Sequence, residues 1–212
     1  MTLRLQITDQ HFILHTTGAL FWEERSMLLI SDAHLGKISH FRKHGAAVPQ
    51  MAIQKNFSAL NALLEQFSPK TTCFLGDLFH SNKNGEWSLF RKWALVAPTQ
   101  LLLVMGNHDI ISQNHYLDLG MEVMDELLLF PFLLTHHPEE RQGHFNMAGH
   151  VHPAVKLKGS GRQYLKLPCF FKRPHQMILP AFGEFTGTHA IKPKEGDEVF
   201  VLTPEKVIKI DC

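Results

Sequence analysis

The sequence contains few cysteines, and their number and spacing exclude two classes of protein. Three cysteines occur in 212 residues, at Cys73, Cys169 and Cys212, and no two of them have the CxxC spacing. An odd number of widely separated cysteines argues against a disulfide framework and against a zinc site built from thiolates. We therefore expect a protein of a reducing compartment, the cytoplasm.

The sequence also lacks a long hydrophobic run and an excess of either charge. No apolar stretch approaches the ~20 residues that a membrane-spanning helix needs, and the first residues alternate instead of forming the apolar part of a signal peptide. Lys and Arg number 21 and Asp and Glu number 20, so the basic footprint of a dedicated nucleic-acid-binding protein is missing. We expect no membrane association, and any binding of nucleic acid must be local.

Apolar residues and histidines are abundant. Hydrophobic residues make up 44% of the chain, enough for a sizeable core, and the length predicts a single domain over residues 1–212. The 15 histidines are a surplus that a metal site would require, although surface histidines alone could produce the same number.

Apolar periodicity predicts an α/β first half and a mostly β second half. A hairpin is expected at 3–14, buried strands at 27–30, 71–75 and 101–105, and helices at 50–67 and 85–97. This alternation is typical of βαβ units with right-handed crossovers. After Gly120 the pattern predicts strands at 127–135, 145–148, 164–171, 177–182 and 198–202.

Polar motifs follow five of the apolar runs. They are Asp32-Ala-His34, Gly76-Asp77, Gly106-Asn107-His108-Asp109, His136-His137-Pro138 and Gly149-His150-Val151-His152. The loops at the carboxyl ends of successive strands converge on one rim of an α/β sheet. The motifs therefore predict a cluster of carboxylate, imidazole and amide groups that can hold two metal ions.

The chemistry of these residues suggests individual roles. Asp32 and His34 are two apart, so on an extended segment they can grip one cation together. Asp77 follows a glycine that allows a sharp turn, and its two oxygens can serve two ions, which makes it the candidate bridge. His150 and His152 would bind different metals if their loop curls, or one metal if it stays extended.

Oxygen and imidazole ligands without thiolates favour Mn, with Fe or Zn as alternatives, over Ca or Mg. Two such ions ~3.5–4 Å apart hold a bridging hydroxide that can attack phosphorus. His108 directly follows Asn107, so it can face the leaving-group oxygen and protonate it. Asp109 would orient that imidazole. The predicted reaction is hydrolysis of a phosphoester.

The order DxH, GD, GNHD, HxP and GHxH resembles the calcineurin-like metallophosphoesterase family over roughly residues 27–153. The resemblance implies a four-layered α/β sandwich, two mixed β-sheets face to face and flanked by helices. It also selects His136 from the adjacent histidines 136 and 137, makes His108 catalytic and makes Asp109 its partner. By the same resemblance, one metal is held by Asp32, His34, Asp77 and His152, and the other by Asp77, Asn107, His136 and His150.

Residues around the motifs narrow the resemblance. The segments 31–37, 76–81, 135–138 and 180–187, in a chain of this length, are similar to the bacterial ligase-associated DNA-damage-response endonucleases, the PdeM group. That group implies metal-dependent phosphodiesterase or nuclease activity on DNA in repair, with a DNA ligase and a helicase as partners. The sequence shows no capping domain or coiled-coil arm of the kind found in double-strand-break nucleases.

Candidate substrate contacts rest on weaker signals. His80 lies three residues after Asp77 and can contact the phosphate, or it is a loop histidine bonded to backbone. Arg42 and Lys43 belong to a cationic stretch that can meet a phosphate backbone, or to a solvated helix face. The segment 170–173, Phe-Phe-Lys-Arg, resembles a single-strand-binding pattern, or it is an ordinary strand.

Three functions are consistent with the sequence. The first is a dinuclear phosphodiesterase or endonuclease that acts on DNA. The second is a small-molecule phosphatase, or a pyrophosphatase for nucleotides or nucleotide sugars, which the near-neutral charge allows. The third is a metal-stabilised module of a DNA-repair complex that does not catalyse a reaction. A panel of substrates distinguishes the first two, and bound metal without turnover would identify the third.

Overall fold

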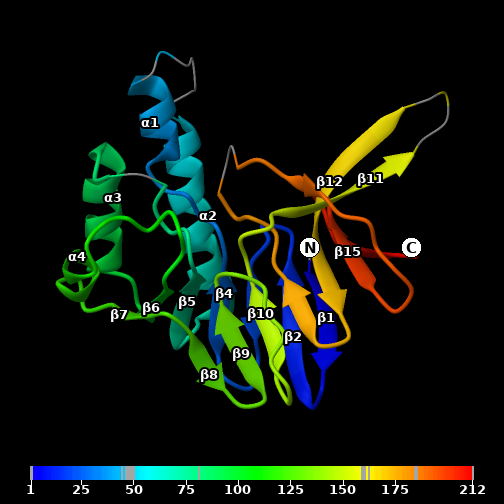
Figure 1. Cartoon of the computed structure of the whole chain (residues 1–212). Coiled ribbons are helices and arrows are strands. Elements are labelled where there is room, and N and C mark those ends of the chain that lie inside the picture. Colours follow the sequence, from blue (N-terminus) through cyan, green and yellow to red (C-terminus); the bar gives the residue numbers. More distant parts are fainter. Residues whose placement is uncertain are drawn as a thin grey trace.

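Two mixed β-sheets lie face to face, and the helices cover the outer side of the first sheet (Figure 1). The computed structural model describes residues 2–43, 45, 51–80, 82–158, 161, 163–183 and 186–211, without the side chains of residues 40, 42 and 43. Among these residues, the structure has no helix that is long and apolar enough to cross a membrane.

The first sheet has seven strands in the order β1 to β7. The first four pair antiparallel and the last four pair parallel, so β4 belongs to both halves. The strands are β1 (Thr2–Ile7), β2 (Gln10–His15), β3 (Leu20–Trp22), β4 (Met27–Ile30), β5 (Thr71–Leu75), β6 (Gln100–Val104) and β7 (Glu122–Met124).

Four helices occur in the described residues, and all of them precede Asp118. They are α1 (Lys37–Lys43), α2 (Met51–Phe67), α3 (Gly85–Ala94) and α4 (Asn114–Leu117). Helix α2 buries Leu60 and Leu64, four residues apart, against the first sheet, and its Ile53 packs against Ile38 of α1. The helices therefore fill the crossovers between the parallel strands.

A buried carboxylate joins α1 to α3. The side chain of Asn84 caps α3 by accepting a hydrogen bond from the N–H of Glu86 at 2.9 Å. The carboxylate of Glu86 accepts in turn from the N–H groups of Gly36 and Ser39, both at 2.8 Å. These bonds fix the start of α1, and with it the position of Lys37, beside α3.

The second sheet has nine strands. Its path runs β14-β11-β12-β13-β10-β9-β8, and β15 joins β12 to β16. Strands β9, β10 and β13 are parallel to one another, whereas β11, β12, β15 and β16 pair antiparallel. The strands are β8 (Leu127–Leu129), β9 (Phe132–Thr135), β10 (Phe145–Ala148), β11 (Pro153–Lys158), β12 (Tyr164–Arg173), β13 (Gln176–Ile178), β14 (His189–Ala190), β15 (Glu198–Leu202) and β16 (Val207–Ile210).

Three apolar clusters hold the layers together. The largest lies between the sheets and includes Leu29, Phe132 and Phe170. A second, with Leu28 and Phe90, packs the first sheet against its helices. A third, smaller cluster lies on the outer face of the second sheet and contains Val155, Cys169, Phe171, Ile178, Val199 and Val201. The alternation of residues along β4 thus sends Leu28 and Leu29 to opposite sides of the sheet.

The predicted α/β fold of two mixed β-sheets face to face is confirmed, and the described helices all lie on the side of the first sheet (Figure 1). The prediction of one strand over 127–135 is wrong, because β8 and β9 form a hairpin that turns at Phe130 and Pro131. Proline lacks the N–H that a continuous ladder needs. The strand expected at 177–182 ends at Ile178, and the helix expected at 85–97 ends at Ala94.

Candidate metal centre

The predicted ligands follow strands of both sheets, and the strand ends meet at one rim. Residues 32 and 34 follow β4, residue 77 follows β5, and residues 107 and 108 follow β6. From the second sheet, residue 136 follows β9 and residue 150 follows β10. The apolar strands therefore position the polar groups, because their carboxyl ends lie side by side.

One group of side chains contains Asp32, His34 and His152, whose ligand atoms lie within 4.8 Å of one another. Nε2 of His152 is 3.1 Å from Oδ1 of Asp32 and 3.4 Å from Nε2 of His34. Asp32 is fully buried, and its Oδ1 makes no hydrogen bond to the described residues. A buried carboxylate oxygen beside two imidazole nitrogens is an arrangement that a cation stabilises.

A second group contains His136, His150 and Asn107. Nε2 of His136 lies 3.0 Å from Oδ1 of Asn107 and 3.2 Å from Nδ1 of His150. His136 is buried, whereas His150 and Asn107 are exposed. This second group therefore forms the open side of the centre.

Asp77 lies between the two groups. Its Oδ1 is 3.4 Å from Nε2 of His136, and its Oδ2 is 3.8 Å from Nε2 of His34. The carboxylate is buried and presents one oxygen to each side. This geometry suits the bridging role that the sequence predicts, since the two oxygens of one carboxylate can bind two ions.

The loops that carry these residues have unusual backbone conformations. Five of the seven candidate ligands have positive φ, between 45° and 66°: Asp32, His34, Asp77, His150 and His152. Non-glycine residues rarely adopt this region. The left-handed turns curl the loop 149–152, so that His150 and His152 reach different groups. Of the two alternatives left open by the sequence, the curled loop is the one observed.

Backbone contacts orient the rings and join the loops. Nδ1 of His136 lies 3.0 Å from the carbonyl oxygen of Leu75, and Nδ1 of His152 lies 3.0 Å from that of Gly187. Such bonds fix the tautomer and leave Nε2 for a metal. The N–H of His150 donates to Oδ2 of Asp32 at 2.9 Å, which ties the two sheets together at the centre.

Burial and neighbouring charges shift the pKa values of the imidazoles. Burial, together with Lys37 and the neighbouring histidines, lowers the pKa of His34 to about 2. Burial and then His137 and His136 lower the pKa of His150. For His152, burial opposes the charged form, but the carboxylate of Asp32 outweighs it and raises the pKa. His34 is thus neutral at pH 7, as a metal ligand must be.

His108 lies at the edge of the cluster. Its N–H donates to Oδ1 of Asp77 at 2.8 Å, and its ring centroid is 5.6 Å from that of His34 and 4.8 Å from that of His80. The ring is half-buried. His108 is therefore close enough to serve a reaction at the centre while its imidazole stays accessible.

Asp109 contacts the backbone around His108. Its Oδ1 accepts from the N–H of Phe79 at 3.0 Å and its Oδ2 from the N–H of Gly106 at 2.9 Å. Burial raises the pKa of Asp109 to about 6, although these two hydrogen bonds favour the charged form. The carboxylate thus holds the loop 106–109 against the loop after β5, and within the described residues no bond from it to the ring of His108 is found.

The candidate substrate contacts differ in where the structure places them. The ring of His80 lies beside those of His34 and His108, with centroids 5.2 and 4.8 Å away. The side chains of Arg42 and Lys43 lie outside the described residues. Phe170 and Phe171 are buried in the core, and Lys172 bonds to Glu198, so these side chains are engaged within the sheet, as in an ordinary strand.

Two residues that the sequence reasoning set aside lie at the centre. Lys37 is half-buried, and burial lowers its pKa although the charges of Asp77 and Asp32 act to raise it. His137 is exposed, and its ring centroid lies 4.1 Å from that of His150. The position of Lys37, directly after Gly36 and three residues after the end of the first motif, was the available signal.

Two mixed β-sheets with carboxylates and imidazoles converging at one rim define a metal-dependent hydrolase of the phosphoesterase class. A sequence model of the calcineurin-like phosphoesterase family matches residues 26–176, and the chain belongs to that family. The family uses a dinuclear metal centre and hydrolyses phosphoester bonds, and the two groups joined by Asp77 provide candidate ligands for it. No curated protein matches the sequence.

Several solved structures are similar to this chain to different degrees. A nuclease named MPE from Pseudomonas putida has a TM-score of 0.84 and 28% identity, over 99% of this chain and 100% of that chain. YfcE, a phosphoesterase from E. coli, has a TM-score of 0.42 and 17% identity, over 84% and 88%. The AQ665 protein of Aquifex aeolicus has a TM-score of 0.43 and 21% identity, over 59% and 78%. The first similarity agrees with the resemblance to the PdeM group.

Proposed function

We propose that this protein is a dinuclear-metal phosphodiesterase that acts as an endonuclease on DNA in repair. The observation that carries the proposal is the position of Asp77, whose two carboxylate oxygens face two separate groups of ligands. Support for a nucleic-acid substrate comes from the similarity, over the full length of both chains, to a protein named as a nuclease.

The proposed ligands divide as the two groups do. Asp32, His34 and His152 hold one ion, Asn107, His136 and His150 hold the other, and Asp77 contributes to both. The donor set of oxygen and imidazole without thiolate favours Mn, with Fe or Zn as alternatives. When bound, two such ions supply Lewis-acid stabilisation of a phosphoryl group and lower the pKa of water.

The side chains around the ligands carry the remaining chemistry. His108 donates a proton to the leaving-group oxygen, since its half-buried ring borders the centre. Asp109 acts through the backbone, because its two hydrogen bonds fix the loop that carries His108. Lys37 and His80 bind phosphate oxygens, and Arg42 and Lys43 contact the substrate strand.

The cellular setting follows from the resemblance to the PdeM group. The proposed partners are a DNA ligase and a helicase, the proposed location is the cytoplasm, and the chain acts as a single domain. Co-purification of the tagged protein with a ligase or a helicase from its source organism tests the partners separately from the chemistry.

Hydrolysis of bis-p-nitrophenyl phosphate tests the reaction. We expect chelated protein to be inactive, Mn to restore turnover, and Asp77→Ala to abolish it. Full activity of the chelated protein or of Asp77→Ala contradicts the metal mechanism. A panel of single-stranded DNA, nicked DNA, a phosphomonoester and a nucleotide sugar then tests the substrate, and preference for either small molecule would replace the nuclease with a phosphatase or a pyrophosphatase.

A further inference from the structure

The hairpin of β11 and β12 has one face that carries three lysines and a tyrosine. Lys156 pairs directly opposite Lys166, and Lys158 pairs opposite Tyr164. Directly opposite residues of an antiparallel pair lie on the same face, as do residues two apart on one strand. We call Lys156, Lys158, Tyr164 and Lys166 the lysine face.

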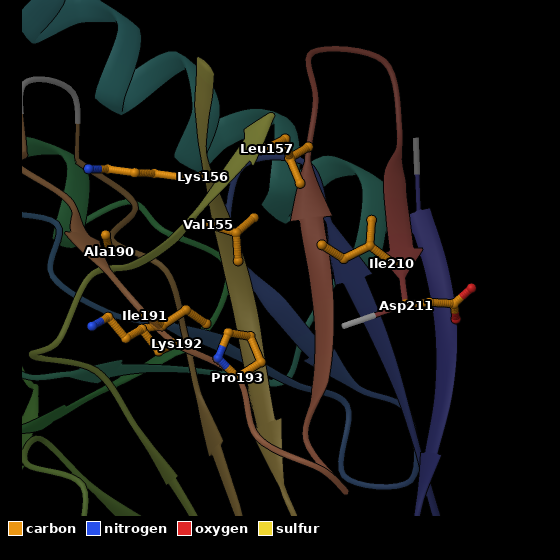
Figure 2. Close-up of a pocket in the computed structure, with 9 residues that line it drawn as sticks. All are labelled: Val155, Lys156, Leu157, Ala190, Ile191, Lys192, Pro193, Ile210 and Asp211. Carbon is orange, nitrogen blue, oxygen red and sulfur yellow. The ribbon is translucent and has the colours of Figure 1, made fainter. Parts of the chain in front are cut away.

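The other face of the hairpin anchors it to the second sheet. Val155 is buried, and Leu157 and Leu167 pack against the outer apolar cluster. Figure 2 shows the side chain of Lys156 extending away from Val155 and Leu157. All four residues of the lysine face are exposed, and Tyr164 is 67% exposed. The hairpin is therefore fixed at its base, and it extends away from the sheets (Figure 1).

The chain around this face carries only positive charges, and the described carboxylates form no ion pair with its three lysines. Between Glu140 and Glu184 the chain has seven Lys and Arg residues and no Asp or Glu. No carboxylate of the described residues forms an ion pair with Lys156, Lys158 or Lys166. Like charges directly opposite each other destabilise a hairpin, and a bound anion would relieve that cost.

The lysine face continues from the metal centre. His152 directly precedes β11, and its Nδ1 contacts the carbonyl oxygen of Gly187. Nζ of Lys166 donates a hydrogen bond to the carbonyl oxygen of Thr188, the residue after Gly187. At ~3.3 Å per residue of strand, Lys156 and Lys158 lie about 13 and 20 Å along the hairpin from His152. That length matches about four to six stacked nucleotides.

We propose that the lysine face binds the sugar-phosphate backbone of a single-stranded nucleic acid that continues to the metal centre. The three ammonium groups contact successive phosphates, and Tyr164 stacks on a base, which is how single strands are bound without sequence preference. This inference rests on the proposed function. It explains how a chain with a formal net charge of +1 can bind a polyanion through local charge.

Fluorescence anisotropy with labelled single strands of about 20 nucleotides tests the proposal, with DNA and RNA as separate arms. Metal-loaded His108→Ala protein provides the background that limits cleavage. In this background we compare the triple variant Lys156→Ala, Lys158→Ala and Lys166→Ala with the protein whose lysine face is unchanged. At ~0.7 counterions per phosphate, the substitutions lower the slope of log affinity against log salt by about 2. Affinity at about 50 mM salt falls about tenfold or more.

A matched control removes the same charge elsewhere. Lys70→Ala, Lys92→Ala and Lys206→Ala, combined, alter three exposed lysines outside the hairpin, and we expect affinity to change less than about twofold. Tyr164→Ala lowers affinity about fivefold or more, and Tyr164→Phe keeps it, because stacking needs the ring alone. Circular dichroism verifies that each variant is folded.

Equal losses in the hairpin and control variants would overturn the proposal, and so would unchanged binding in the hairpin variant. In either case the lysines serve only to keep an exposed hairpin soluble. Comparison of the affinities for DNA and for RNA shows which nucleic acid the lysine face prefers. Absence of turnover toward bis-p-nitrophenyl phosphate by the wild type would instead contradict the proposed function, and the binding result still decides the role of the lysine face.

Discussion

Nε2 of His34 and Nε2 of His152 lie 3.4 Å apart, although the two residues are separated by 118 positions in the sequence. The first follows a strand of one sheet and the second precedes a strand of the other. The pair therefore joins the two layers of the sandwich at the point where the oxygen of Asp32 also converges. Anything that binds these nitrogens stabilises the contact between the sheets.

Metal should stabilise the folded protein. The candidate ligands come from both sheets, so we expect an ion to bind only the folded state. Such an ion adds stability that rises with the logarithm of its concentration, about 2.7 kcal/mol at a hundred times its dissociation constant. We expect the melting temperature of chelated protein to rise on titration with Mn. His152→Ala should reduce the rise and the metal content, measured by plasma mass spectrometry. A melting temperature that is the same with and without metal would contradict this prediction.

Gly76→Ala should disrupt the second group of ligands. Gly76 has a φ of +77°, which is unfavourable for alanine, and an added Cβ would overlap the ring of His136. We expect metal content and turnover to fall together, with a loss of about 1–3 kcal/mol in the free energy of unfolding. Gly85→Ala is the control, since nothing lies within 4 Å of its added Cβ. Normal metal content in Gly76→Ala would show that His136 is not a ligand.

Asp109→Ala should lower both stability and turnover, whereas His108→Ala should lower turnover alone. Removal of the buried carboxylate leaves the N–H groups of Gly106 and Phe79 without an acceptor, at a cost of about 1–3 kcal/mol. If Asp109 acts only by positioning His108, the Asp109→Ala substitution should have little further effect on turnover when it is added to His108→Ala. Additive losses of turnover in the double variant would give Asp109 a direct role.

Glu198 should make the second sheet sensitive to acid. Hydrogen bonds from Lys172 and then Lys209 lower the pKa of Glu198 below its ordinary value of 4.5. A carboxyl whose pKa is lower in the folded state contributes stability above its unfolded value, and the contribution disappears as the pH falls through the folded value. Glu198→Gln should therefore lose up to about 1 kcal/mol at pH 7, discounted for partial exposure.

Urea unfolding at a series of pH values measures the effect of Glu198→Gln. The difference from the wild type should shrink as the pH falls below 4.5 and vanish below the folded pKa. Glu205→Gln removes an exposed carboxylate of the same sheet region and is the control. A difference between Glu198→Gln and the wild type that is constant with pH would mean that the contribution is packing and not charge.

Much of the fold was predictable because the apolar pattern of its longer elements is visible in consecutive residues. The continuous apolar runs at 27–30 and 71–75 predict the strands of the parallel half with the bounds observed, and the stripe of α2 predicts its whole length. Strands β3, β7, β11, β14 and β16 were missed. All of them except β11 have four residues or fewer, too few for an alternating apolar pattern to stand out in the sequence.

The candidate site was predictable in its residues but not in its grouping. The motifs contain every side chain of the two groups. The separation of His150 from His152 depends on left-handed backbone conformations, which the residue types do not predict. The bonds of Asp109 to backbone were likewise invisible, since they join loops after different strands. The lysine face required the register of Lys156 with Lys166, which is a property of the pairing and not of the composition.

The left-handed conformations at the rim set stability against function. Each non-glycine residue in the left-handed region lowers the stability of the fold by roughly 1 kcal/mol, and five candidate ligands lie in this region. Glycine at one of these positions would relax the chain while removing a ligand. Selection of this protein for heat resistance alone, in medium without metal, should therefore enrich substitutions at its own active residues, and selection for turnover is needed to retain them.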